Sequence, residues 1–140
     1  MSQDARNMVD HPAHYTNGPF ECITLTSTYS FRIGNAVKYV WRHPYKNRPV
    51  EDLDKAAWYL DSAKKAGERP TPRKPDGTPP DNASLDFNER MLAELIAIDW
   101  SHAAPFWRAL RDRDMDGMLQ AVRALRETEA RDTPDRGRLA

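Results

Sequence analysis

The stretch FRIGNAVKYVWRH, residues 31–43, decides the fold because its apolar residues recur with the period of an α-helix. They occupy positions i, i+4, i+7 and i+8, which lie on one face of a helix. This apolar stripe consists of Ile33, Val37, Val40 and Trp41. We therefore expect a helix that turns this face toward a hydrophobic core and ends at Pro44 and the KNRP turn.

A polar stripe runs along the opposite face of the same helix. It consists of Asn35, Lys38, Tyr39 and Arg42. Two cations four residues apart repel each other slightly, and an anion bound between them removes this cost. The planar guanidinium of Arg42 suits a phosphate group, and Lys38 adds a compact charge. The alternative is a solvated face on which both cations pair with carboxylates of the next helix. Those carboxylates are Glu51, Asp52 and Asp54.

A second helix is expected from Pro49 to about Ala66, with carboxylates at the positive end of its dipole and Gly67 as its stop. The short connection makes the two helices antiparallel neighbours, so residues 21–66 form a helical hairpin that carries the candidate site. The polar stripe of the second helix consists of Asp52, Lys55 and Tyr59. If the two stripes face each other, they enclose either a cleft suited to a nucleoside phosphate or an interhelical salt-bridge network. Trp41 and Trp58 are expected in the core or in an interface.

An irregular N-terminal arm is expected over residues 1–20, because this segment is polar and contains Pro12 and the turn pair Asn17-Gly18. Residues 21–30 are rich in β-branched side chains, which favours a strand by propensity. Four residues of this segment also fall at helical spacing, and we expect a short helix on that ground. They are Cys22, Leu25, Thr26 and Tyr29.

The arm contains the stretch HPAHYTNGPFEC, in which His11 and His14 lie three residues apart. A zinc site needs further ligands, and the nearest candidates are Glu21 and Cys22. The chain has no second cysteine and no helix is expected to fix the histidine pair, so we expect no metal site. General acid–base chemistry by one histidine is favoured over metal binding, because the pKa of an imidazole lies near neutrality. A histidine that only forms hydrogen bonds is the simpler alternative.

The second half of the chain begins with a Pro-rich segment, residues 67–84, which contains five prolines and two glycines. It cannot form a core of its own and is expected to be a linker or an exposed loop. Residues 85–130 are expected to form a C-terminal helical segment, and residues 131–140 a frayed tail. The chain as a whole is therefore expected to be mainly α, a helical bundle with an irregular N-terminal arm and a Pro-rich internal linker.

The C-terminal helices carry recognisable start signals. Ser84 is the expected N-cap of the first of them, and Pro105 fits the first turn of a short second helix. Either Asp114 or Asp116 is expected to begin the last helix.

Composition limits the classes of function. The 140 residues suffice for one domain, and 39% hydrophobic residues allow a modest core, which favours a homo-oligomer that completes its burial by self-association. The 21 basic and 21 acidic residues leave no net charge, so nucleic-acid binding is not expected and an anion site must be local. No apolar run approaches the ~20 residues of a membrane-spanning helix, and the N-terminus lacks the apolar core of a secretory signal. With one cysteine, the chain is expected to work in a reducing cytoplasm.

Three blocks of the sequence together resemble a known family. HPAHYTNGPFECI, GNAVKYVWRH and EDLDKAAWYLD are similar, in order and spacing, to a small phage-encoded family long catalogued only as a domain of unknown function. It is typified by the early-gene nucleotide kinase of a T-odd coliphage. The resemblance covers about residues 9–65 and implies a phage protein that phosphorylates deoxynucleoside monophosphates in the host cell cytoplasm. It implies a kinase without a P-loop, whose GxxxxGK[ST] motif the chain lacks.

The resemblance also implies the site residues by their positions. The catalytic candidates are His14, Lys38, Arg42 and Asp52. The ligand-binding candidates are His11, Tyr15, Glu21, Asn35, Tyr39, Lys55 and Tyr59. Together with the polar stripes, this predicts an arm that closes over a phosphate-binding cleft. No metal and no tightly bound cofactor are expected, and ATP or another nucleoside triphosphate is the expected phosphate donor.

Two other functions stay open. A non-catalytic phage protein that sequesters nucleotides, or targets a host protein as a counter-defence factor, would use the same cleft without turnover. Its partner surface would include three aromatic residues of the C-terminal half, Trp100, Phe106 and Trp107. A nucleoside triphosphate pyrophosphohydrolase of the MazG type needs several carboxylates to hold magnesium. Here only Glu51 and Asp54 have the required spacing.

Overall fold

The computed structural model describes residues 18–132, and all the regular secondary structure in this part of the chain is helical. The predicted mainly α fold is confirmed. Its elements follow in the order α3 (Cys22–Thr26), α4 (Phe31–Arg42), η1 (His43–Tyr45), α5 (Pro49–Ala66), α6 (Asn82–Ala97), η2 (Trp100–His102), α7 (Ala104–Arg111) and α8 (Met115–Asp132), where η marks a 3₁₀ turn. None of these helices is long and apolar enough to cross a membrane. The predicted arm residues His11, His14 and Tyr15 lie outside the described residues, as does the tail beyond residue 132.

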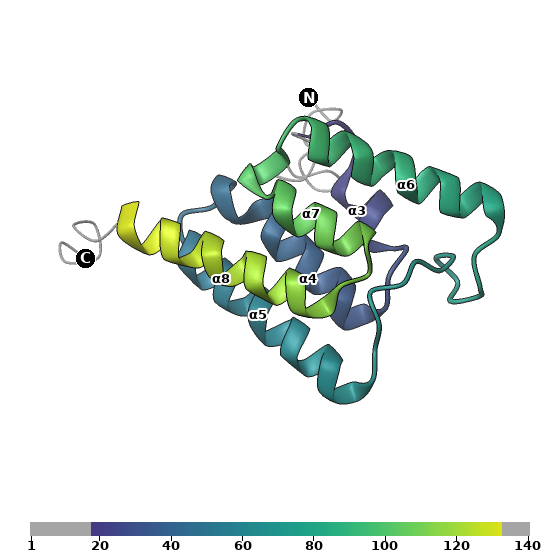
Figure 1. The fold of residues 1–140 in the computed structure, drawn as a ribbon, viewed down its shortest axis with the longest axis horizontal. Helices are drawn as coiled ribbons and strands as arrows, with labels where there is room; N and C mark the ends of the chain where they lie inside the picture. Colours follow the sequence, from purple (N-terminus) through teal and green to yellow (C-terminus); the bar gives the residue numbers. More distant parts are fainter. Residues whose placement is uncertain (1–17, 133–140) are drawn as a thin grey trace, which may run out of the picture.

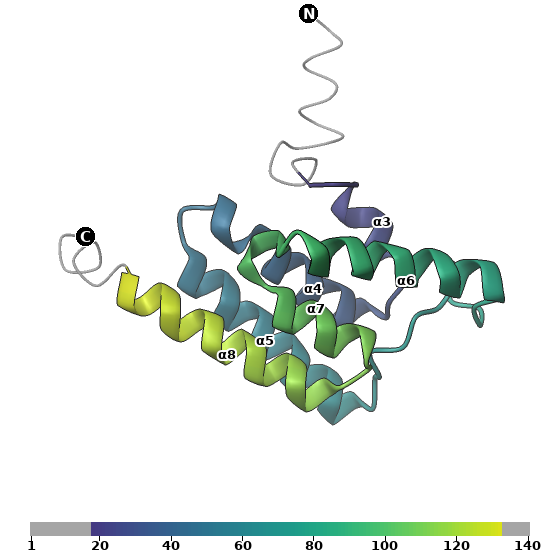
Figure 2. The ribbon, with the colours of Figure 1, turned by 45° about the horizontal axis from the view of Figure 1, so that its top comes forward.

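Helix α4 lies in the middle of the bundle, between α6 on one side and α5 with α8 on the other (Figure 1, Figure 2). All four residues of its predicted apolar stripe are fully buried. Burying an aliphatic side chain such as Ile33 contributes roughly 1.5–3 kcal/mol. Trp41 adds edge-to-face contacts with Trp100 and Trp107, at ring-centroid distances of 5.4 and 6.3 Å. The apolar period of residues 31–43 thus produces the central helix.

Helix α5 begins and ends where its sequence predicts. Pro49 lies in the first turn, and Gly67 ends the helix with a φ of 79°, a left-handed conformation that glycine adopts without a Cβ clash. The start of α5 contacts the end of α4, as in the Arg42–Asp52 pair, and its end contacts the start of α4. The two helices are therefore antiparallel, as predicted.

The short helix α3 confirms the helical alternative for residues 21–30, although it covers only five of them. Its residues Cys22 and Leu25 are buried. Helices α3 and α4 approach closely at Gly34, where an added Cβ would lie 2.9 Å from the backbone oxygen of Thr26. Glycine is needed at this position because any side chain would meet the backbone of the neighbouring helix.

The Pro-rich segment packs against the bundle along its first part, so its prediction as a linker or an exposed loop is wrong there. Pro70 and Pro72 are buried. The Arg73 amide donates a hydrogen bond to the Thr28 carbonyl oxygen at 2.7 Å, which fastens the segment to the end of α3. Residues 75–79, around Gly77, are exposed.

Two of the three predicted helix starts in the C-terminal half are confirmed. Pro105 lies in the first turn of α7, and the Asp114 carboxylate accepts a hydrogen bond from the Gly117 amide at the start of α8, at 3.0 Å. The predicted N-cap Ser84 is wrong, because Asp81 caps α6 instead. The Asp81 carboxylate accepts from the Ser84 amide and the Ser84 hydroxyl accepts from the Asp81 amide, which is a capping box.

Helix α8 runs antiparallel along α5 and joins the C-terminal half to the hairpin (Figure 1). Lys64 Nζ lies 3.0 Å from the Asp116 carboxylate at one end of this contact, and Arg126 Nε lies 2.9 Å from the Asp54 carboxylate farther along. One hydrophobic core includes residues of both halves. The C-terminal helices therefore belong to the same bundle as the hairpin.

The three aromatic residues predicted as a partner surface pack into this bundle or against its core. Phe106 and Trp107 are fully buried, and Trp107 Nε1 donates to the Trp100 carbonyl oxygen at 2.9 Å. Trp100 is half-buried. The prediction that these residues form a partner surface is wrong, because they fill the core under α4.

Replacing Gly34 with alanine should lower the free energy of unfolding by about 1–3 kcal/mol, the usual cost of overpacking. The new Cβ meets a backbone oxygen that cannot rotate away, and this cost exceeds the gain of about 1 kcal/mol from better helix propensity. Gln120→Ala on the exposed face of α8 is the matched control and should change stability by less than ~0.5 kcal/mol. Urea unfolding measures both variants. A Gly34→Ala protein as stable as the parent would contradict the close approach of α3 and α4.

His43 is a fully buried histidine at the end of α4. Its Nδ1 donates to the Val40 carbonyl oxygen at 2.6 Å, and its Nε2 lies 4.0 Å from the Glu129 carboxylate. Burial lowers the pKa of the imidazole below its ordinary value of 6.5, and outweighs the opposite effects of Val40 and Glu129. The ring is therefore neutral in the folded protein at neutral pH.

Acidification should destabilise the protein through this histidine. As pH falls through 6.5, the unfolded chain takes up a proton on His43 that the folded protein excludes. The free energy of unfolding should fall by up to about 1.4 kcal/mol per pH unit in this window. His43→Gln keeps a donor for the Val40 carbonyl and should show a smaller pH dependence in urea titrations between about pH 7.5 and about pH 5.5. An unchanged slope would show that His43 is not the group that titrates.

Candidate functional site

The candidate site lies where α4 meets α5 and is centred on the ring of Tyr39. Three cations surround this ring: Lys38 Nζ lies 4.5 Å, Arg42 Cζ 5.4 Å and Lys55 Nζ 5.6 Å from its centroid. The negative face of an aromatic ring attracts such charges. The two polar stripes therefore face each other. We call Lys38, Arg42 and Lys55 the cation cluster.

A second aromatic ring holds Tyr39 in place. Tyr59 of α5 stacks on it, with 5.9 Å between the ring centroids and 15° between the ring planes. Tyr59 also makes edge-to-face contacts with Trp58 at 5.1 Å and with Phe31 at 6.4 Å. Trp58 is 63% exposed and Phe31 is 71% exposed. Of the two places predicted for Trp58, the core is therefore excluded, whereas Trp41 is a core residue.

Asp52 is a buried carboxylate inside the site. It is 4% exposed, and its Oδ2 lies 3.5 Å from Arg42 Nε. A buried carboxylate is costly without a counter-charge, so this ion pair fixes the position of both side chains. The salt-bridge alternative is right for this pair. The other two carboxylates considered for it turn elsewhere: Asp54 pairs with α8, and Glu51 lies 3.8 Å from Lys55 on the exposed surface.

Lys38 is the least neutralised member of the cation cluster. It is half-buried, and no carboxylate of residues 18–132 lies within ion-pair distance of it. Burial, followed by the positive charge of Arg42, lowers the pKa of the Lys38 ammonium, and Lys55 acts in the same direction. Asp52 offsets this effect only in part. The site therefore has a local excess of positive charge that a bound anion would relieve.

The remaining predicted residues lie toward α3. Asn35 Nδ2 donates to the Phe31 carbonyl oxygen at 2.8 Å. Glu21 is the N-cap residue of α3 and is half-buried. Cys22 is buried, and this burial raises the pKa of its thiol to about 12. The thiolate is therefore absent at neutral pH, and Cys22 is a packing residue rather than a nucleophile.

A hollow of about 350 Å³ adjoins Lys38, between α3, α4 and the Pro-rich loop. None of the described residues that line it is acidic. Its polar lining includes Thr26, Ser27, Ser30, Asn35, Lys38 and Arg73. Sequence reasoning missed Arg73 as a site residue, because it lies beyond the family-like blocks. The only signal for it was its place in a mildly basic run at the start of the Pro-rich segment.

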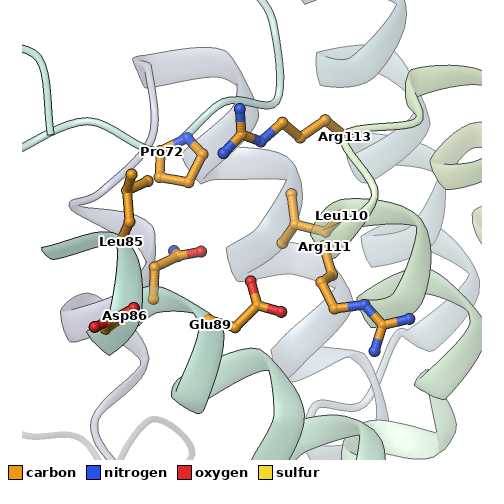
Figure 3. Close-up of a pocket in the computed structure, with 8 residues that line it drawn as sticks. Pro72, Leu85, Asp86, Glu89, Leu110, Arg111 and Arg113 are labelled. Atoms are coloured by element: carbon orange, nitrogen blue, oxygen red, sulfur yellow. The ribbon is translucent and has the colours of Figure 1, made fainter. Parts of the chain in front are cut away.

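A second hollow, of about 340 Å³, lies between α6, α7 and the loop (Figure 3). It is lined by Arg111 and Arg113 but also by Asp86 and Glu89. Figure 3 shows the Glu89 carboxylate turned toward the middle of the hollow and Arg113 on the opposite side. Because the carboxylates repel a phosphate group, this hollow suits an anion less well than the one beside Lys38.

The Arg42–Asp52 pair should show strong energetic coupling in a double-mutant cycle with alanine. Because Asp52 is buried and the Arg42 side chain is 20% exposed, we expect a coupling of about 1–3 kcal/mol in the free energy of unfolding. The matched control is the Lys55–Glu51 pair, whose side chains are 49% and 45% exposed, with an expected coupling of about 0.2–0.5 kcal/mol. Urea unfolding at constant ionic strength measures both cycles. Equal couplings would contradict a special role for Asp52 in holding Arg42.

Comparison with known proteins bears on the first half of the chain. Residues 9–61 match the sequence model of a family described as a protein of unknown function (DUF3310). This segment contains α3, α4 and the part of α5 that carries Lys55 and Tyr59, so the site residues described above fall within it except for Arg73. No curated protein and no solved structure matches the chain. The match supports the resemblance to a small family of uncharacterised function, while the phage origin and the nucleotide chemistry stay predictions.

Proposed function

We propose that this protein is a phage enzyme that binds nucleotides at the cation cluster and transfers a phosphoryl group to a (deoxy)nucleoside monophosphate. The observation that carries the proposal is the excess of positive charge around Tyr39. Lys38 has no carboxylate partner among residues 18–132, and Lys55 has only an exposed one. All three cations belong to the blocks that resemble the phage nucleotide kinase family.

Lys38 and Arg42 are assigned to the phosphate groups. Asp52 holds the planar guanidinium of Arg42, and Lys38 supplies a charge that no described carboxylate cancels. Phosphoryl transfer depends mainly on positioning the reactants and on neutralising the phosphate oxygens. A site with fixed cations and few free carboxylates meets this need without a P-loop.

In the proposed reaction, an oxygen of the acceptor monophosphate attacks the terminal phosphorus of ATP or another nucleoside triphosphate. The new oxygen–phosphorus bond forms as the bond from the terminal phosphorus to its bridging oxygen breaks. The products are two nucleoside diphosphates, one from the acceptor and one from the donor. The proton of the acceptor phosphate needs an accepting group, and we assign this role to His14 of the arm. Asp52 is assigned to positioning, because it is buried against Arg42.

The role of His14 follows from the family resemblance, and the described chain begins at Gly18, which contacts the buried face of α4. Gly18 lies against the ring of Trp41, and Phe20 makes an edge-to-face contact with the same ring at 5.4 Å. Trp41 directly precedes Arg42 on α4. His11 and Tyr15 are assigned, together with His14, to the lining of the closed site.

Aromatic side chains next to the cation cluster are assigned to the nucleoside. Phe31 and Trp58 are exposed and contact Tyr59, which stacks on Tyr39. Nucleobases stack on such rings with little dependence on sequence. In the self-association that we propose, exposed apolar side chains elsewhere, such as Ile98, would be covered by a second copy.

A nucleotide-sequestering protein is the second candidate. It is favoured by the engagement of Asp52 with Arg42, which leaves proton transfer to the arm. Its host-targeting form has less support because the aromatic residues proposed as a partner surface lie in the core. The pyrophosphohydrolase is the least supported, since Glu51 and Asp54 turn to different partners. Within residues 18–132, no group of three or more His, Cys, Asp or Glu side chains is placed to hold a metal ion.

Transfer of radiolabelled phosphate from ATP to a panel of deoxynucleoside monophosphates tests the proposal. Lys38→Ala and Arg42→Ala should each lower kcat/KM by about 10²-fold, because each removes a cation from the transferring group. His14→Ala should lower kcat while the melting temperature without ligand stays unchanged. Lys65→Ala, an exposed cation at the end of α5, is the matched control and should retain full activity.

Three outcomes separate the candidates. Full activity in both Lys38→Ala and Arg42→Ala would overturn the assignment of the cation cluster. No transfer to any monophosphate, combined with a melting temperature raised by a nucleotide, would identify a sequestering protein. Magnesium-dependent release of pyrophosphate from a nucleoside triphosphate would identify the pyrophosphohydrolase instead.

A further inference from the structure

The hollow between α3, α4 and the Pro-rich loop has cations at two of its walls. Lys38 enters it from α4 and Arg73 from the loop. None of the described lining residues is acidic, and the rest of the lining combines hydroxyl and amide side chains with apolar residues such as Ile23, Phe31 and Pro75. An anion bound in this hollow would be attracted by both cations, and no described acidic residue of the lining would repel it.

Arg73 is held in place by its backbone rather than by its side chain. Its amide donates to the Thr28 carbonyl oxygen at 2.7 Å, which fixes the loop on α3. Its buried Nε has no hydrogen-bond partner, and its guanidinium forms no ion pair with residues 18–132. No described carboxylate therefore neutralises the charge of Arg73.

The three carboxylates of the loop are engaged by other groups. Asp76 Oδ1 accepts hydrogen bonds from the Thr78 amide at 3.0 Å and the Thr78 hydroxyl at 2.6 Å. Glu68 is bound by Arg32 and by the Ser30 hydroxyl. Asp81 caps α6 and lies 3.2 Å from Lys74 Nζ. The two adjacent cations of the loop therefore differ: Lys74 has a protein carboxylate as its partner, and Arg73 does not.

We propose that this hollow is a second anion subsite, in which Arg73 and Lys38 bind neighbouring phosphate groups of a polyphosphate chain. The ligand class is a nucleoside di- or triphosphate, so the subsite belongs to the phosphate donor. As a nucleotide site this inference rests on the proposed function, since Lys38 is common to both subsites. A volume of about 350 Å³ is at the lower end for small-molecule sites and suits the phosphate chain rather than the whole nucleotide.

Binding of inorganic pyrophosphate and of inorganic phosphate to the full chain tests the subsite independently of any base. Both ligands are titrated while the backbone amide signals are followed by NMR. Pyrophosphate should bind at least about 10-fold more tightly than phosphate, because it reaches both cations, and Arg73→Ala should remove most of this difference. Arg73→Lys should keep part of it, since the charge stays and the planar fork is lost. Lys74→Ala is the matched control and should bind pyrophosphate like the parent protein.

The same variants separate the failure of this inference from the failure of the proposed function. Equal pyrophosphate affinity in the parent and Arg73→Ala, at unchanged melting temperature, would overturn the subsite. If deoxynucleoside monophosphates still bound in a Lys38- and Arg42-dependent way, the proposed function would stand without it. If the protein bound pyrophosphate in an Arg73-dependent way but bound no nucleotide, the anion subsite would stand and the proposed function would be overturned. Should Arg73→Ala fail to fold, Arg73→Lys and Arg73→Gln replace it in the comparison.

Discussion

The burial of one face of α4 is the constraint on which the rest of the structure depends. Its apolar stripe fills the middle of the bundle, and Trp41 packs against Trp100 and Trp107 from the other half of the chain. Because the angles between helix faces are set by 3.6 residues per turn, burying this stripe also sets the direction in which Lys38 and Arg42 leave the helix. The position of the cation cluster is therefore a geometric consequence of the core.

Helix α5 completes the candidate site by packing its own side chains against those of α4. Its Asp52 meets Arg42 below the surface, and its Tyr59 stacks on Tyr39. On an isolated helix the cations would be solvated and their mutual repulsion would be weak. Packed between two helices they are partly desolvated, and electrostatic effects become stronger for repulsion and for ligand binding alike. The free energy of core packing thus holds like charges close together, and a bound anion would offset the repulsion between them.

The fold could be predicted from local signals wherever one or two residues decide a helix end. Pro49 and Gly67 bound α5 in this way. The start of α6 was misplaced because Asp81 and Ser84 are both good N-caps, and only the capping box between them shows that Ser84 is the N3 partner. Trp58 could not be placed either, because a chain has too little polar surface to cover itself and some large apolar side chains stay outside.

The sequence by itself determined the helical period of residues 31–43, the two polar stripes and hence most of the residues of the candidate site. The tertiary structure decided which charges meet. It paired Asp52 with Arg42, left Lys38 without a described carboxylate partner, and placed Arg73 and Lys38 in the lining of one hollow. The physical reason is that helical period and capping depend on neighbours along the chain, whereas charge pairing depends on how distant segments pack. No pattern in the Pro-rich segment shows that burying Pro70 and Pro72 brings the next arginine to α3 and α4.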